Sequence, residues 1–148
     1  MTEVSPIRLW AMRAMYLFMA AGIGGMIWPL IVSHSSTVPR MTGVAWALIG
    51  TIGLLSLLGL RYPLRMIPLL LVELVWKAIW LAAFALPRWL DGTLDEGMRT
   101  TIFETSFGAI LLVVIPWRYV WANYVAKPGD PWTLRRPGER PATAGAQS

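Results

Sequence analysis

The chain has 148 residues, of which 56% are hydrophobic and only 14% are charged, and its mean hydropathy is +0.56. Soluble globular domains carry about 25% charged residues, so this composition excludes a soluble domain. The chain has no cysteine and a single histidine, His34. This excludes disulfides, thiolate chemistry, Cys-ligated metal centres and a haem held by two histidines, and we expect no cofactor and no metal ion.

The 13 Lys and Arg residues outnumber the 8 Asp and Glu residues, which gives a formal net charge of +5. The basic residues lie beside apolar segments instead of forming a patch interleaved with aromatic residues, so we expect no nucleic-acid partner. Orientation in a lipid bilayer explains the excess of positive charge better.

Four blocks of apolar residues have the length of a membrane span. They cover residues 14–33, 41–60, 66–87 and 102–121. About 20 helical residues cross the hydrocarbon core of a bilayer. The predicted fold is therefore all-α: an integral membrane antiparallel four-helix bundle over residues 1–125. A cleavable signal peptide would be an alternative for the first block, but such peptides have an apolar core of about 7–15 residues and a small-residue cleavage site, and neither fits here.

Small residues recur along one side of the second block. Gly43, Ala47 and Gly50 are spaced so that they fall on one helix face, and Ala21 and Gly25 form a shorter version in the first block. Such a stripe allows a neighbouring helix to approach closely. We expect it to serve helix packing inside the bundle, with homodimerisation as the alternative.

The fourth block has ionisable residues near both ends. Glu104 is predicted to be a solvated carboxylate in the first turn, where it would suit the positive end of the helix dipole, and Arg118 an anchor at the other interface. In the preceding loop, Thr93 and Glu96 have the spacing of a capping box, which predicts a short helix beginning there.

The last part of the chain, residues 126–148, has a different character. It is rich in Pro, Gly and Arg and nearly devoid of aliphatic residues. Such a segment cannot bury enough apolar surface to offset the loss of chain entropy on folding. We therefore predict a disordered C-terminal tail.

The distribution of the basic residues predicts an orientation. With four spans, both termini and the connection between the second and third blocks share one side of the membrane. That side collects Arg8, Arg13, Arg61, Arg65, Arg118, Lys127, Arg135, Arg136 and Arg140, whereas the other side has Arg40, Arg88 and Arg99. The positive-inside rule then places both termini and the tail in the cytoplasm. The residues expected to anchor the chain at this interface are Arg61, Arg65, Arg118, Trp117 and Trp121.

The third block contains an ionisable pair at membrane depth. Glu73 and Lys77 are four residues apart with the acid first, the favourable order for an ion pair within a helix. Trp76, Trp80 and Phe84 fall on the same side of a helical wheel. Since each unpaired charge would cost roughly 3 kcal/mol in a membrane, this face is predicted to point into the bundle.

This pair makes Glu73, Lys77, Trp76 and Trp80 the candidate intramembrane polar site. Three interpretations stay open. The charges could neutralise each other as a structural pair, they could belong to a proton or cation pathway, or they could line a pocket for a lipid or quinone headgroup.

Two stretches carry a resemblance to known proteins: LRYPLRMIPLLLVELVWKAIWLA, which begins at Leu60, and IPWRYVWANYVAKPGDPW, which ends at Trp132. Both are similar to recurring stretches in a group of small bacterial membrane proteins with four predicted helices and no assigned activity. The resemblance implies a location in the bacterial inner membrane. It also implies importance for a set of residues, Arg61, Pro63, Glu73, Trp76, Lys77, Arg118 and the Pro-Gly-Asp turn at 128–130.

These observations favour a non-enzymatic accessory or scaffold protein whose partners are the lipid bilayer and either further copies of itself or a larger membrane complex. The alternative is a small proton- or cation-coupled transporter that uses Glu73 and Lys77. An enzyme acting on lipid or isoprenoid substrates is disfavoured, because the sequence has no nucleophile and base arrangement and no acidic metal motif.

Overall fold

The computed structural model describes residues 4–34 and 36–129, so most of the predicted tail lies outside the described residues. All regular structure in the described part of the chain is helical. The elements are α1 (Pro6–His34), α2 (Arg40–Arg61), α3 (Ile67–Trp80), a π-helical turn η1 (Leu81–Ala85), α4 (Leu86–Leu90), α5 (Glu96–Ser106), α6 (Ala109–Val114), α7 (Trp117–Val120) and a second π-helical turn η2 (Trp121–Val125).

Four helical stretches are long and apolar enough to cross a membrane. They are Pro6–His34, Arg40–Arg61, Ile67–Leu90 and Glu96–Val114. The third consists of α3, η1 and α4 in continuous succession, and the fourth of α5 and α6. The prediction of an all-helical chain with four long apolar helices is confirmed.

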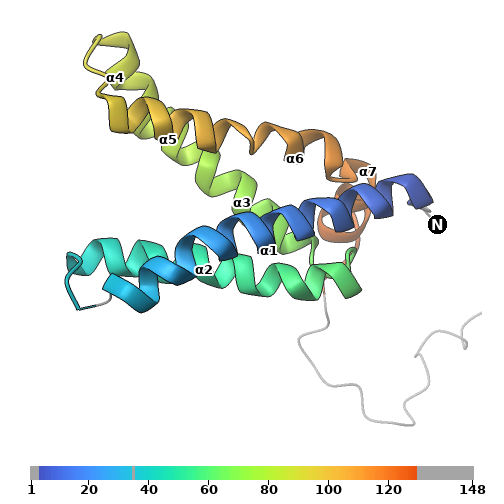
Figure 1. Ribbon diagram of the computed structural model, residues 1–148. Helices are drawn as coiled ribbons and strands as arrows, with labels where there is room; N and C mark the ends of the chain where they lie inside the picture. The colour runs from blue at the N-terminus through green and yellow to red at the C-terminus, as the bar shows by residue number, and fades with distance from the viewer. Residues whose placement is uncertain (1–3, 35, 130–148) are drawn as a thin grey trace, which may run out of the picture.

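Helices α1 and α2 pack closely along each other (Figure 1). Glycines make this possible: a Cβ atom at Gly53 would lie 3.1 Å from the backbone nitrogen of Gly24, and one at Gly59 would overlap the ring of Tyr16. A Cβ at Gly50 would lie 3.2 Å from the side chain of Ile31. The two helices therefore meet almost backbone to backbone.

The predicted stripe on α2 is only partly correct. Gly50 faces α1, but Ala47 is exposed and Gly43 has no neighbour on α1 within 4 Å. The contact face continues from Gly50 toward the C-terminal end of α2, where Gly53 and Gly59 contact α1. The prediction placed the stripe too far toward the N-terminal end of α2, because sequence spacing alone does not show at which level a neighbouring helix crosses.

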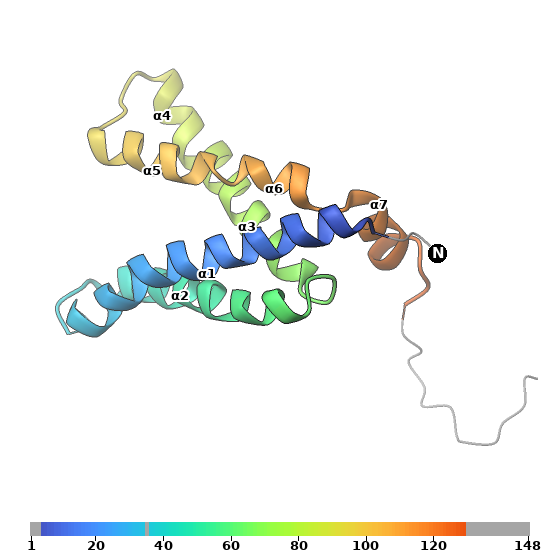
Figure 2. The same cartoon turned by 45° about the vertical axis from the view of Figure 1, so that its right-hand side comes forward.

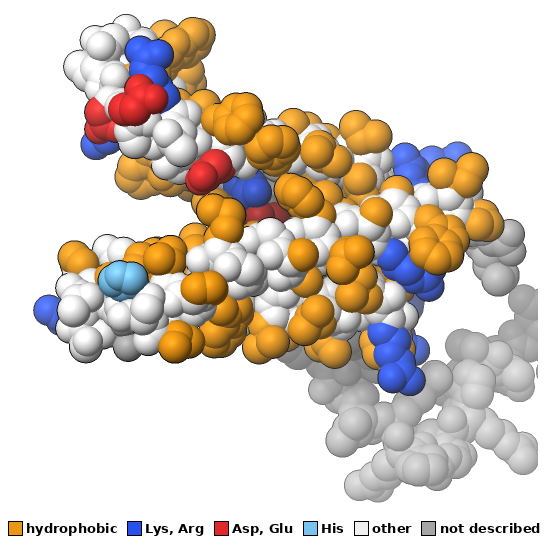
Figure 3. Space-filling view, in the orientation of Figure 1, with side chains coloured by type: hydrophobic (Ala, Val, Ile, Leu, Met, Phe, Trp, Pro, Cys, Tyr) orange, Lys and Arg blue, Asp and Glu red, His pale blue; other side chains and the backbone are white. Residues whose placement is uncertain are grey.

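The long helix formed by α3, η1 and α4 leads away from α2, and α5 and α6 return along it (Figures 1 and 2). This second helix pair meets α1 and α2 at the end of the molecule that carries the N-terminus and α7, and diverges from them toward the opposite end. We call the opening between the two pairs the notch; the space-filling view shows it as a wedge that narrows toward the middle of the molecule (Figure 3).

The core lies where the two pairs meet. Its fully buried side chains come from α1, α3, α6 and the residue after α6: Met12, Tyr16, Met19, Ile67, Leu70, Leu111 and Ile115. Hydrogen bonds reinforce the contact of α1 with the last turn of α2 and the connection that follows it. The Tyr16 hydroxyl donates to the carbonyl oxygen of Pro63 (3.0 Å), and Nε of Arg13 donates to that of Leu60 (3.2 Å).

The fourth long helix begins earlier in the chain than the apolar block indicated. Asp95 is its N-cap, and Oδ1 of this residue accepts a hydrogen bond from the backbone N–H of Met98 (2.7 Å). The short helix predicted to begin there is present, but the capping box at Thr93 and Glu96 is wrong, because Asp95 and not Thr93 is the N-cap. The Thr93 hydroxyl instead donates to the carbonyl oxygen of Arg88 (3.4 Å), because the chain between them forms a turn.

The same helix also ends earlier, at Val114. Ile115 adopts an extended conformation with ψ of 125°, and Pro116 follows it. The proline ring disfavours helical geometry in the preceding residue, which explains the stop. A proline also accounts for η1. In this widened turn the N–H of Leu86 donates to the carbonyl oxygen of Leu81, and Pro87 follows directly. In a regular helix the proline ring would clash with the carbonyl one turn earlier, and the wider turn relieves this clash.

Candidate functional site

Glu73 is buried inside a helix that is otherwise apolar on both sides of it. Its exposed fraction is 1%, although it lies only six residues after the start of α3 at Ile67. The indole Nε1–H of Trp76 donates a hydrogen bond of 2.6 Å to Oε2 of Glu73. Because Trp76 lies one helical turn further on, the same helix supplies both the carboxylate and its donor.

Lys77 completes the cluster. Its ammonium nitrogen lies 2.8 Å from Oε1 of Glu73 and 5.5 Å from the centre of the Trp76 ring, which allows an ion pair and a cation–π contact together. The geometry at Oε1 has the distance of an ion pair but not the angles of a hydrogen bond. Among the buried side-chain oxygen and nitrogen atoms of residues 4–34 and 36–129, Oε1 is thus the one without a directed donor.

The stem of Lys77 also contacts the second helix of its pair, at Gly108. A Cβ atom at Gly108 would lie 2.7 Å from Cδ of Lys77 and 3.0 Å from the carbonyl oxygen of Thr105. Gly108 lies in the break between α5 and α6, where its N–H donates to Thr105 (2.9 Å) across a tight turn. Sequence reasoning missed this contact; the only signal was a glycine inside an apolar span.

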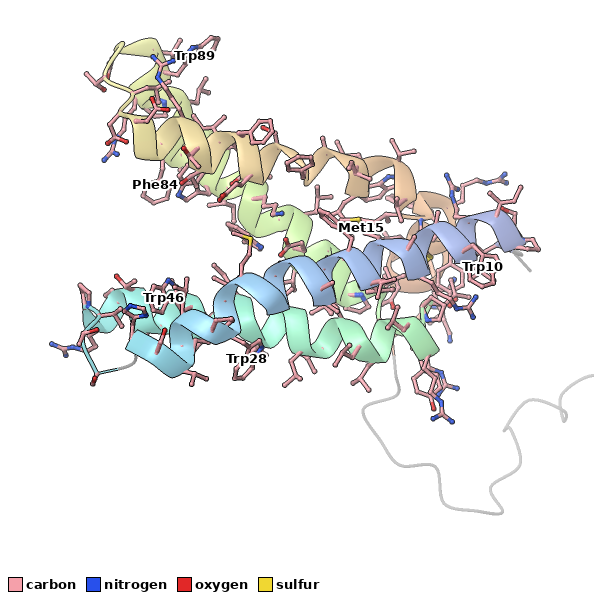
Figure 4. The ribbon with its side chains drawn as sticks, in the orientation of Figure 1. Trp10, Met15, Trp28, Trp46, Phe84 and Trp89 are labelled. Atoms are coloured by element: carbon pink, nitrogen blue, oxygen red, sulfur yellow. The ribbon has the colours of Figure 1, made fainter. Side chains whose placement is uncertain are left out.

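The aromatic residues of the predicted face differ in their surroundings. Trp76 and Trp80 are half-buried, but Phe84 is 55% exposed, so the prediction that it points into the bundle is wrong. Phe84 belongs to η1, where the helix widens and the angular step per residue used for a helical wheel no longer holds. Figure 4 shows Phe84 on the part of the long helix that diverges from α1 and α2.

Glu104 lies deeper in its helix than predicted. Since α5 begins at Glu96, Glu104 is eight residues inside, about 12 Å at the helical rise of about 1.5 Å per residue. It falls near the middle of the Glu96–Val114 stretch and its side chain is exposed. The prediction of a first-turn carboxylate is therefore wrong, because polar residues 96–101 are helical and shift the start of the helix.

The predicted interface anchors, Arg61, Arg65, Arg118, Trp117 and Trp121, all have exposed side chains. Basic side chains gather at the end of the molecule where the two helix pairs meet (Figure 3), and Trp10 lies at this end, whereas Trp46 and Trp89 lie at the other (Figure 4). The guanidinium carbons of Arg61 and Arg65 lie 5.5 Å and 5.8 Å from the centre of the Tyr62 ring.

Charged side chains thus gather at the basic end, at the far end around the connection between α4 and α5, and in a small group at the head of the notch where Figure 3 shows acidic and basic side chains among apolar ones. Within residues 4–34 and 36–129, no three His, Asp or Glu side chains come close enough together to hold a metal ion. The ion pair of the polar group at the notch is neutral overall.

No family model, no curated protein and no solved structure matches this chain. Its function has to be argued from the arrangement of its own side chains.

Proposed function

We propose that this chain is a four-span protein of the bacterial inner membrane that acts as a non-enzymatic accessory or scaffold protein. In this proposal the four long helices cross the bilayer as an antiparallel bundle, and both termini are cytoplasmic. The gathering of basic side chains at one end supports this orientation (Figure 3). The 19 residues of Glu96–Val114 support the crossing, since they reach about 28 Å, close to the thickness of the hydrocarbon core.

The observation that carries the scaffold role is that the candidate site is complete without a ligand. Trp76 donates to one oxygen of Glu73, Lys77 neutralises the other, and the stem of Lys77 packs on Gly108. A buried ion pair of this kind contributes to stability mainly through the cost of breaking it, because removal of one partner leaves the other charge unpaired in a medium of low dielectric constant. The pair therefore fixes how α3 meets α5 and α6.

A comparison of single and double variants tests this role. We expect Glu73→Gln alone and Lys77→Met alone each to lower the free energy of unfolding in micelles by about 3 kcal/mol, because each leaves one buried charge unpaired. The double variant should recover most of this loss. Arg40→Met, at an exposed helix start, is the matched control and should change little. Additive effects of the two substitutions would contradict the structural pair.

The alternative, a proton- or cation-coupled transporter, is favoured by one observation: Oε1 of Glu73 is buried without a directed hydrogen bond. An ionisable pair at membrane depth is also a recurring feature of proton pathways. Proton flux into vesicles that contain a pH-sensitive dye distinguishes the two functions. If the folded double variant loses a flux that the unaltered protein supports, the transporter is right and the scaffold role is wrong; if neither protein conducts, the scaffold proposal stands.

A further inference from the structure

Glu104 is an exposed carboxylate at the depth where a membrane protein tolerates charge least. It lies in the last turn of α5, four residues before Gly108, which follows in the break after this helix and is where Lys77 of α3 makes contact. Glu104 is therefore placed at the side of the helix that borders the notch. Its neighbours on this side are Thr101, which is half-buried, and Thr105, which is buried.

The polar residues around Glu104 leave its carboxylate without a cationic partner. The hydroxyls of Thr101 and Ser106 donate to carbonyl oxygens of their own helix, those of Gly97 and Ile102. The Glu73–Lys77 contact is the one ion pair within residues 4–34 and 36–129, and it occupies the ammonium of Lys77. Ionisable residues at mid-membrane usually pair with one another or face water, because an isolated charge is costly in lipid.

We propose that the notch receives a transmembrane helix of a different protein, and that a Lys or Arg near the middle of that helix pairs with Glu104. This inference rests on the proposed accessory function and names the chemistry of its partner. The space-filling view shows the notch opening from the head, where the charged side chains gather, to the outside of the molecule (Figure 3).

Charge complementarity favours a different protein over a second copy. Two of the described basic residues lie further inside a long helix: Lys77 is already paired, and Arg13, two turns inside α1, donates to the carbonyl oxygen of Leu60. The others lie in the end turns of the long helices or beyond them and are Arg8, Arg40, Arg61, Arg65, Arg88, Arg99, Arg118 and Lys127. A second copy could bring none of these to the level of Glu104 while its own helices crossed the same bilayer.

Energy transfer in vesicles tests this proposal on the full chain. The donors are the nine tryptophans of the protein, and the acceptor is a dansyl group on a synthetic single-span helix of Leu and Ala with one central Lys. A helix with Leu in place of the Lys is the matched probe. We expect the Lys helix to associate with the protein roughly tenfold more tightly than the Leu helix in phosphatidylcholine vesicles.

Glu104→Gln should remove this preference, whereas Glu96→Gln, an exposed first-turn carboxylate of the same helix, should keep it. Circular dichroism of both variants checks that they fold. Equal binding of the two probes, or a preference that survives in Glu104→Gln, would overturn the proposal. Self-association of the unaltered protein that is lost in Glu104→Gln would overturn it in favour of a second copy. The coupling between Glu73 and Lys77 is measured separately, so failure here leaves the scaffold role intact.

Discussion

The two helix pairs of this protein are built on different physical principles. Helices α1 and α2 are regular over 29 and 22 residues and meet through glycines, with the backbone of Gly24 against Gly53. The second pair is interrupted by a widened turn at 81–85 and by a break at 107–108, and it meets at a lysine stem that lies on Gly108. Apolar packing holds both pairs, but the second pair also has polar contacts, within α3 among Glu73, Trp76 and Lys77 and across the pair between Arg88 and Met98.

This difference shows where the molecule can carry function. Close packing of backbones leaves no room for an ionisable group, since every atom at the contact is already in van der Waals distance. Irregular helices leave gaps and expose carbonyl groups, and the ionisable residues in the middle of long helices, Glu73, Lys77 and Glu104, lie in the second pair. The fully buried polar residue of the first pair, Ser56, is uncharged. Three substitutions test this contrast, in order of decreasing expected loss of the free energy of unfolding.

Gly59→Ala should disrupt the first pair most strongly. Because the added carbon would overlap the ring of Tyr16, which is fully buried and bonded to Pro63, the two helices must separate. We expect a loss of about 3 kcal/mol in the free energy of unfolding, measured by denaturant titration in mixed micelles. Gly22→Ala, which has open space around the new carbon, is the control. An equal effect of both substitutions would show that the helices are not packed in this way.

Gly108→Ala should weaken the second pair less. The new carbon meets Cδ of Lys77, which can move because the stem is flexible, and the carbonyl of Thr105, which cannot move easily. We expect a loss of about 1–2 kcal/mol. In the Lys77→Met background the effect should stay similar, since Met also has a long side chain. In Lys77→Ala it should shrink, and the same titration measures both; an unchanged loss in Lys77→Ala would contradict the contact.

Tyr16→Phe should have the smallest effect of the three. It removes the hydroxyl that donates to the carbonyl oxygen of Pro63 but keeps the ring in the core. The expected loss is about 1 kcal/mol, the net value of a buried hydrogen bond between neutral groups. Amide hydrogen exchange should increase in the connection between α2 and α3 and stay unchanged at the 91–95 connection. A uniform increase would mean that Tyr16 does not tie α1 to that connection.

The sequence was sufficient for features that depend on local composition. The four long helices follow from the lengths of the apolar blocks, and the Glu73–Lys77 contact has the spacing of neighbours on one helix face. The short helix predicted to begin near Thr93 and Glu96 is present, but it is continuous with the fourth apolar block, which the apolar pattern alone did not indicate because residues 96–101 are mostly polar. Asp95 caps this helix, and the hydroxyls of Thr100 and Thr101 donate to carbonyls one turn earlier.

Features that depend on contacts between distant parts of the chain could not be predicted. Whether Gly108 lies beside Lys77 depends on the position along each helix at which the two segments meet. A sequence pattern shows which residues share a helix face but not which residues of two helices lie opposite each other. The position of Phe84 depends on η1, since a helical wheel assumes the same rotation at each residue. The surroundings of Glu104 were unpredictable for both reasons. Its position along the helix depends on the start of α5 at Glu96, and its position relative to the notch depends on the contact between Gly108 and Lys77.

The widened turn η1 also sets how the third long helix tolerates a change in length. Its hydrogen bond from Leu86 to Leu81 encloses one more residue than an α-helical bond does. Deletion of one residue between these two would let the segment close as a regular α-helix, and because the wide turn holds the extra residue within a single turn, everything beyond it would keep nearly its orientation relative to α3. Arg88, whose guanidinium lies 3.1 Å from the sulfur of Met98, would then stay beside α5. The third long helix can therefore lose one residue at this turn without reorienting its far end, whereas a deletion within α3 would rotate that end by about 100°.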